Sequence, residues 1–313
     1  MSTVRVELLS DLTSTKLQEI LRRSLTSSSL TVTEVRDPEE LSGVVSYGSN
    51  LRKLVAMVED EGMSREIHLV AKAAIRLWYV ALPNVWFNMF IFFRESLFFS
   101  TAIPELSKLV TTEQAVALEA VLPKVHHAYC NYDEDNLSRC CLFKPKEKGV
   151  ILMENLMVGE EKYVDMKEIE KTSGGGVKTA HMRMVLEGLA HFHGAWMVWM
   201  RKGDGLGNKT KAQILDLFKQ QDFYKYRWIW KWTIKKFMTR YSILAEAKND
   251  QSTKEKVDAF MTSPETVDKF IKAFGYEDSH FKTITHSDFH TGQVMFSLNK
   301  DGESKGCIKY KGN

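Results

Sequence analysis

The sequence predicts an α+β fold, with a strand-rich first half and a helix-rich second half. Three observations support this prediction. Alternating apolar residues and two turns between residues 43 and 74 are typical of antiparallel strands. The continuous apolar stretch GVILMENLMVG, from Gly149 to Gly159, indicates a buried strand and its connector. After Gly159, long stretches repeat their apolar residues at steps of three and four, as amphipathic helices do.

The first elements follow from local patterns. We expect a helix over Ser14–Ser24 and an extended segment over Leu30–Val35. A tight turn at YGSN and a second at EDEGMSRE then separate strands. The next strand, EIHLVAKAAI, places Ile67, Leu69 and Ala71 on one face, and Lys72 belongs to the other.

One apolar segment could indicate a membrane protein. Leu77–Phe93 is mostly apolar, but a membrane span needs about 20 such residues, and Pro83, Asn84 and Asn88 interrupt this segment. We therefore expect a buried or partly inserted segment and no stable membrane span. Helices over residues 93–100 and 112–122 should follow it.

The second half contains several helical patterns. They cover residues 179–200, 223–241 and 264–274. The helix over 223–241 is both basic and aromatic, so it could bind a membrane surface or a partner. More often such a helix buries its aromatic residues in its own domain and solvates its lysines, and we expect that arrangement here.

Bulk properties narrow the class of protein. A chain of 313 residues has room for one large domain or two modest ones, and its net charge of +3 is too small to indicate nucleic-acid binding. Its four cysteines have no C-x-x-C spacing and read as reduced thiols. The N-terminus shows no signal-peptide pattern, so we expect a cytoplasmic protein.

Two further patterns suggest other chemistry. SGGGVKT resembles a phosphate-binding loop, but Val177 stands where the pattern needs glycine, and no strand precedes it. His286, Asp288 and His290 could ligate a metal in a hydrolase. However, Ser287 occupies the position at which the zinc-protease pattern needs glutamate.

An ordered series of residues fits phosphoryl transfer from ATP better. That reaction needs a strand lysine for the phosphates, a helix glutamate that positions the lysine, a loop aspartate and metal ligands. Lys72 in LVAKA, Glu95 in FFRESLFF and Asp288 in THSDFH occur in that order, and Gln293 stands where a metal-binding amide is needed.

These segments resemble the choline-kinase-like family, which includes ecdysteroid-kinase-like proteins and is related to aminoglycoside phosphotransferases. The resemblance covers residues 41–296. It is carried by SYGSNLRKLV, HLVAKA, FFRESLFFSTAIPEL, VILMENL, GLAHFHGAW and THSDFHTGQVMF.

The resemblance implies a two-lobed protein-kinase-like fold, with an N-lobe over residues 1–157 and a helical C-lobe over residues 158–313. ATP and Mg²⁺ would be the cofactors, and the hydroxyl of a small-molecule alcohol would accept the phosphoryl group. Asp288 would be catalytic and Gln293 would bind the metal. The residues implied in nucleotide binding are Ser49, Lys72, Glu95, Glu154, Asn155 and Leu156.

The sequence departs from the family pattern at three places. Ser287 replaces a glycine, and Gln293 replaces an asparagine. The final segment, NKDGESKGCIKYKGN, lacks the Asp-Phe pair whose aspartate binds magnesium in the family. We therefore expect an incomplete C-lobe and impaired catalysis. The alternative is a non-catalytic kinase-like protein that binds a nucleotide or a partner.

Overall fold

The computed structural model describes residues 4–40, 49–74, 91–107, 121–131, 148–158, 163–172, 178–202, 227–262, 265, 294–298 and 304–310. The chain forms two compact units. Met1–Lys211 and Thr283–Asn313 make the first unit, and Ala212–Lys282 make the second. The predicted lobe boundary after residue 157 stays a prediction.

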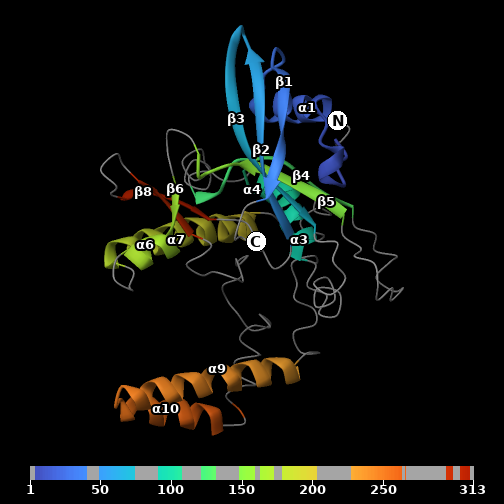
Figure 1. Cartoon of the computed structure of the whole chain (residues 1–313). Helices are drawn as coiled ribbons and strands as arrows, with labels where there is room; N and C mark the ends of the chain where they lie inside the picture. Colours follow the sequence, from blue (N-terminus) through green and yellow to red (C-terminus); the bar gives the residue numbers. More distant parts are fainter. Residues whose placement is uncertain are drawn as a thin grey trace. The chain divides into compact units, whose positions relative to one another are not determined.

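A five-stranded antiparallel sheet forms the centre of the first unit (Figure 1). Its strand order is β1-β2-β3-β5-β4. The strands are β1 (Thr31–Glu40), β2 (Ser49–Asp60), β3 (Met63–Ala74), β4 (Val125–Asn131) and β5 (Lys148–Glu154). The extended segment, the strand containing Lys72 and the strand predicted from GVILMENLMVG are therefore all confirmed.

The turn between β2 and β3 is the one predicted at EDEGMSRE. Glu61 and Gly62 both have positive φ, 52° and 80°. Two such residues make a mirror-image turn, whose twist matches that of the flanking strands. The two strands pair over their full length and project well beyond β4 and β5 (Figure 1).

The sheet is buried on both faces at β3, and the alternation predicted for this strand is confirmed. Leu69 and Ala71 pack in one core with residues of the first helix, including Leu17. Val70 and Ala74, which point the other way, pack in a second core with Phe92. Each core therefore takes every second residue of the strand.

The first helix, α1 (Ser14–Leu25), has nearly the predicted bounds and follows the short 3₁₀ turn η1 (Leu9–Asp11). It begins after Thr13, whose side-chain oxygen accepts a hydrogen bond from the Lys16 amide at 3.3 Å. This bond satisfies one of the amides that a helix leaves without a partner in its first turn.

A broken helix lies over the other face of the sheet. It consists of α3 (Ile91–Leu97), the π-helix η2 (Phe98–Ala102) and α4 (Ile103–Ser107). The helix predicted over residues 93–100 is therefore confirmed, but its last turn is wider than an α-helical turn. Residues 77–90 of the apolar segment and most of the helix predicted over 112–122 lie outside the described residues. Within the described part of the chain, no helix has the length and apolar character of a membrane span.

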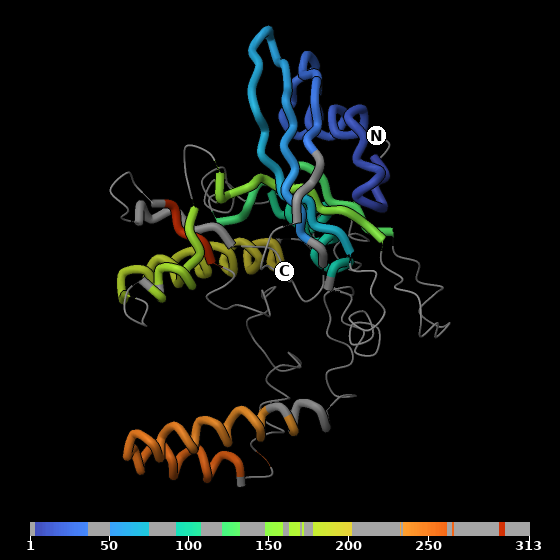
Figure 2. The backbone as a smooth tube through the Cα atoms, viewed as in Figure 1, coloured from blue at the N-terminus to red at the C-terminus, as the bar shows by residue number. Residues whose placement is uncertain are grey.

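A second sheet joins segments far apart in the sequence. It contains β6 (Tyr163–Asp165), β7 (Val294–Leu298) and β8 (Ser304–Tyr310), in that order and antiparallel. Figure 2 shows β6 and β7 side by side despite their distance along the chain. The short helix α6 (Met166–Thr172) follows β6, and the long predicted helix is α7 (Thr179–Lys202). The ring of His181 on α7 lies 5.0 Å from that of Phe296 on β7.

Aromatic rings connect the broken helix to α7. The ring centre of Phe98 lies 6.0 Å from that of Phe192 and 5.9 Å from that of Trp196. Trp196 also meets Trp199 edge to face. These large side chains bury much apolar surface, so they fix η2 against α7.

The second unit contains α9 (Arg227–Ala247) and α10 (Gln251–Thr262). Asp250 caps α10, and Ser242 donates a hydrogen bond to Asp258 at 2.9 Å. The expected burial of the α9 aromatic residues is wrong for Phe237 and Tyr241, which are 58% and 49% exposed. Small residues such as Ser242 instead face α10, and the two aromatic rings contact each other outside that interface.

The mixture of an antiparallel sheet in the first half and helices in the second confirms the predicted α+β class. The arrangement is consistent with a two-lobed kinase-like fold.

The close approach of β4 and β5 gives a test of the fold. Replacing Gly149 with alanine should lower the free energy of unfolding by about 1–3 kcal/mol, the usual effect of overpacking. A Cβ atom there would lie 2.7 Å from the Cα of Cys130 and closer still to the carbonyl oxygen of Tyr129. Urea unfolding would measure the change.

Gly194→Ala in α7 is the matched control, because nothing lies within 4 Å of the Cβ it would add. Alanine should raise stability there by about 0.5–1 kcal/mol, since it restricts the unfolded chain more than glycine does. If the two variants unfolded at the same urea concentration, the tight strand contact would be contradicted.

Candidate functional site

The candidate site begins with a buried lysine on β3. Lys72 pairs with Leu51 of β2 and Ile151 of β5 in strand register, so it lies inside the sheet. It belongs to the face that packs against α3, together with Val70 and Ala74. Its side chain is only 2% exposed. A cation so completely buried is rare unless a partner or a function retains it.

Glu95 on α3 supplies the partner. Its Oε2 atom lies 2.5 Å from Nζ of Lys72, and the Glu95 side chain is only 7% exposed. The contact is an ion pair between the Lys72 ammonium and the Glu95 carboxylate. The structure therefore brings together the strand lysine and the helix glutamate of the predicted series.

Burial shifts the pKa of Lys72. Removal from water lowers the pKa of Lys72 to about 7, because the charged ammonium loses its hydration. The carboxylate of Glu95 acts in the opposite direction by favouring the charged form. The Lys72 amine therefore has a pKa near neutral pH. A further anion beside it would favour its charged ammonium form.

Ser49 lies near the lysine along the sheet. It is the first residue of β2 and pairs with Ala74, while Leu51 pairs with Lys72. The segment preceding Ser49, residues 41–48, lies outside the described residues. The predicted role of Ser49 in nucleotide binding stays a prediction.

Three of the residues implied in nucleotide binding, Glu154, Asn155 and Leu156, lie where β5 ends; this segment is called the hinge below. Glu154 is the last residue of β5, and its Oε1 atom accepts a hydrogen bond from the Lys124 amide at 2.7 Å. Asn155 is buried; its amide donates to the carbonyl oxygen of His68 at 3.0 Å, and its side-chain oxygen accepts from the Met157 amide. These bonds hold the chain in a fixed turn as it leaves the sheet.

Leu156 connects this turn to the second sheet. Its carbonyl oxygen accepts a hydrogen bond from the Tyr163 amide of β6 at 2.9 Å. No described residue accepts a hydrogen bond from its own amide. The segment therefore presents a backbone donor at the point where the chain passes between the two sheets.

The remaining predicted residues lie outside the described residues. Asp288 and Gln293 are among them, as are His286 and His290 of the hydrolase alternative. Strand β7 begins at Val294, immediately after Gln293, and pairs with β6. Across the described part of the chain, no group of three or more acidic, histidine or cysteine side chains could hold a metal ion.

Comparison with the models of known protein families assigns the chain to one family. The model of the ecdysteroid kinase-like family matches residues 45–308, which include all the predicted site residues. The chain belongs to the ecdysteroid kinase-like family. No curated protein and no solved structure gave a match.

Membership in the ecdysteroid kinase-like family makes the chain, in the broad sense, a kinase-like phosphotransferase. A kinase-like family generally uses ATP as the phosphoryl donor. The family resemblance predicted from the ordered segments is therefore confirmed.

The hydrogen bonds that hold residues 154–156 in place were not predicted from the sequence. The carboxylate of Glu154 and the amide of Asn155 bind partners at Lys124 and His68, which are distant in the sequence. A signal existed only for Asn155, because asparagine after a strand often forms a turn through its own side chain. No sequence pattern identified Lys124 or His68 as the partners.

The buried ion pair predicts an asymmetric response to substitution. At pH 6, below the pKa of Lys72 in both the folded and the unfolded chain, Lys72→Met should lower the free energy of unfolding by about 3–5 kcal/mol. The reason is that a buried carboxylate would remain without its counter-charge. The double variant Lys72→Met/Glu95→Leu should recover most of this loss in urea unfolding, because no charge would stay buried.

The exposed pair of Arg183 and Glu187 on α7 is the control. Their side chains are 81% and 64% exposed and 3.8 Å apart, so Arg183→Gln should not change the urea midpoint measurably. A double variant no more stable than Lys72→Met would show that the two buried charges do not depend on each other.

Proposed function

We propose that this member of the ecdysteroid kinase-like family is an ATP-dependent phosphotransferase that acts on the hydroxyl group of a small molecule. The observation that carries the proposal is the buried pair of Lys72 and Glu95. Their ammonium and carboxylate groups come from two different elements, strand β3 and helix α3, and lie 2.5 Å apart.

The energetics of the pair favour a functional explanation. Apolar residues of similar volume often stabilise a protein as well as a buried ion pair, or better, because desolvation opposes the attraction between the charges. The pair is therefore not required by stability alone. A lysine held beside a carboxylate can neutralise the charge of a nucleotide phosphate, which is the main task of a protein that transfers phosphoryl groups.

The residues present fit ATP. In the proposal, the Lys72 ammonium binds phosphate oxygens and Glu95 holds that ammonium in position. Ser49 belongs to the hairpin that covers the phosphates, and Glu154, Asn155 and Leu156 receive the adenine ring. The Leu156 amide suits this role because no described residue uses it as a donor.

Whether the chain can bind magnesium depends on the predicted catalytic loop, which contains Asp288 and Gln293. Mg²⁺ prefers oxygen ligands, and the side-chain carbonyl oxygen of Gln293 is one such group. When bound, the metal would neutralise charge on the phosphates. Asp288 would orient the acceptor hydroxyl and take its proton as the oxygen attacks the γ-phosphorus atom of ATP, while the bond from that phosphorus to the leaving ADP breaks.

The second candidate is a kinase-like protein that binds a nucleotide or a partner without transferring phosphate. Ser287 and Gln293 favour it, because both replace the residues of the family pattern in the loop. The side chain of Gln293 is one methylene longer than asparagine, so its oxygen would reach a metal from a different position. The two candidates share the nucleotide site and differ only in the transfer step.

Nucleotide binding tests what the two candidates share. The double variant Lys72→Met/Glu95→Leu should bind MgATP about 10- to 100-fold more weakly than the natural sequence. The estimate reflects the loss of one charged contact of about 1.5–3 kcal/mol. Isothermal titration calorimetry would measure both dissociation constants.

Lys53→Met is the control, because Lys53 is an exposed lysine of the neighbouring strand β2. It removes the same charge from the same sheet without touching the buried pair. If Lys53→Met weakened MgATP binding as much as the double variant did, the assigned role of Lys72 would be wrong.

Phosphoryl transfer separates the two candidates. Asp288→Asn should lower the transfer rate by about 10²–10⁴-fold, the usual contribution of a general base. MgATP affinity should stay within about twofold, since Asp288 is assigned to the acceptor hydroxyl and not to the nucleotide. A panel of small alcohols with mass detection of the phosphorylated product would measure the rate. If the natural sequence bound MgATP but transferred no phosphate, the non-catalytic candidate would be correct.

A further inference from the structure

The hinge continues into a β-turn that uses most of its own backbone groups. The Val158 amide donates a hydrogen bond to the carbonyl oxygen of Asn155 at 3.3 Å, which closes the turn. The Asn155 amide donates to the carbonyl oxygen of His68 at 3.0 Å, so the turn is also fixed to β3. Backbone groups inside a protein nearly always find such partners.

The side chain of Asn155 holds the turn from within. It is only 7% exposed, and its Oδ1 atom accepts a hydrogen bond from the Met157 amide at 3.1 Å. Asparagine often bonds in this way to the backbone two residues on. The amides of Asn155, Met157 and Val158 are therefore all used. Within the described part of the chain, the Leu156 amide is the donor that this turn offers to a ligand.

Glu154 fixes the start of the same turn. Its amide donates to the carbonyl oxygen of Lys124 at 2.9 Å, and its Oε1 atom accepts from the Lys124 amide at 2.7 Å. The side chains of Glu154 and Asn155 are thus both bonded to backbone amides of the protein. A ligand at the hinge would meet the backbone of Leu156.

The strand register relates this turn to Lys72. Lys72 pairs with Ile151, and Glu154, three residues further along β5, pairs with Leu69. A strand rises about 3.3 Å per residue, so the turn begins roughly 10 Å along the sheet from the lysine. This spacing suits a nucleotide, in which a ribose separates the base from the phosphates.

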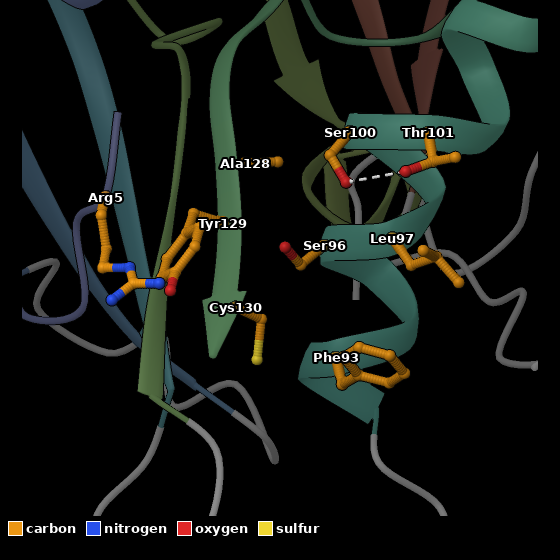
Figure 3. Close-up of a pocket in the computed structure, with 9 residues that line it drawn as sticks. All are labelled: Arg5, Phe93, Ser96, Leu97, Ser100, Thr101, Ala128, Tyr129 and Cys130. Atoms are coloured by element: carbon orange, nitrogen blue, oxygen red, sulfur yellow. Dashed lines mark hydrogen bonds between the residues drawn. The ribbon is translucent and has the colours of Figure 1, made fainter. Parts of the chain in front are cut away.

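The cavity beside the broken helix does not belong to this arrangement. It has a volume of about 550 Å³ and lies between the broken helix and β4 (Figure 3). Figure 3 shows Ala128 and Cys130 facing the helix, whereas Tyr129 lies on the other side of the strand. Its described lining includes neither Lys72 nor any residue of the hinge.

We propose that Asn155 is a positioning residue for the nucleotide base. By holding the Met157 amide, its side chain directs the Leu156 amide toward a ring nitrogen that accepts a hydrogen bond. Adenine has such an acceptor at N1, whereas guanine carries a hydrogen atom there. Asn155 thereby sets a preference for ATP over GTP. This inference deepens the proposed function and rests on it.

The base preference tests the role of Asn155. Calorimetry with the full chain should show MgATP binding about 10-fold more tightly than MgGTP, the ratio that one hydrogen bond supplies. Asn155→Ala should weaken MgATP binding about 10-fold and change MgGTP binding by less than about twofold, because only adenine loses its donor. Asn155→Asp keeps the acceptor oxygen and should retain the preference.

Two further variants make the result specific. Asn131→Ala removes another asparagine of the same sheet, whose side chain bonds to Glu7 at 3.1 Å, and should leave the preference intact. Lys72→Met/Glu95→Leu should weaken both nucleotides by the same factor, because ATP and GTP carry the same phosphates.

The outcomes separate this inference from the proposed function. Equal affinity of ATP and GTP for the natural sequence, equal weakening of both by Asn155→Ala, or loss of the preference in Asn155→Asp would overturn the role of Asn155 and leave the nucleotide site standing. If the natural sequence bound neither nucleotide, the proposed function would be refuted, and this inference with it.

Amide hydrogen exchange followed by NMR tests the two contacts directly. Without nucleotide, the Met157 amide should exchange about 10-fold faster in Asn155→Ala than in the natural sequence or Asn155→Asp, because it loses its acceptor. An unchanged rate would overturn the positioning role. In the natural sequence, saturating MgATP should slow exchange at Leu156 and saturating MgGTP should not. An unchanged Leu156 rate with MgATP bound would overturn the contact with the base, and this last measurement needs no variant.

Discussion

The candidate site depends on one interaction, the burial of the Lys72 ammonium against the Glu95 carboxylate. The interaction joins the central strand of the sheet to the helix on its second face, and both groups are almost completely removed from water. In such surroundings each charge is tolerated only because the other is present. The ion pair therefore determines two properties together: the position of α3 over the sheet and the protonation state of Lys72.

The rest of the first unit supports this pair from several directions. Phe92 and its core hold α3 against the sheet, and Phe98 holds the following turns against Phe192 and Trp196 of α7. At the end of β5, the carbonyl oxygen of Leu156 connects the large sheet to β6. Because β6 pairs with β7, the strand that follows the predicted catalytic loop belongs to the same unit.

Local patterns predicted much of this fold. The alternation around Lys72 specified both faces of β3, and the ordered segments indicated Lys72 and Glu95 as partners. The π-helix η2 could not be predicted, because its wide turns have no distinctive residue pattern. The cavity was missed because its walls combine the broken helix and β4, which only tertiary packing brings together. The expectation for α9 failed at Phe237, since helical spacing defines a stripe but not the neighbour that covers it.

The most direct test follows the ammonium of Lys72 itself. The ¹³Cε resonance of this lysine, assigned by its loss in Lys72→Arg, can be followed in NMR spectra as the pH is changed. Without nucleotide, we expect a midpoint near 7, because burial lowers the pKa of Lys72 to about 7. Saturating MgATP should raise that midpoint, because phosphate oxygens favour the charged form. A midpoint that does not move when the nucleotide is bound would show that the Lys72 ammonium does not bind its phosphates.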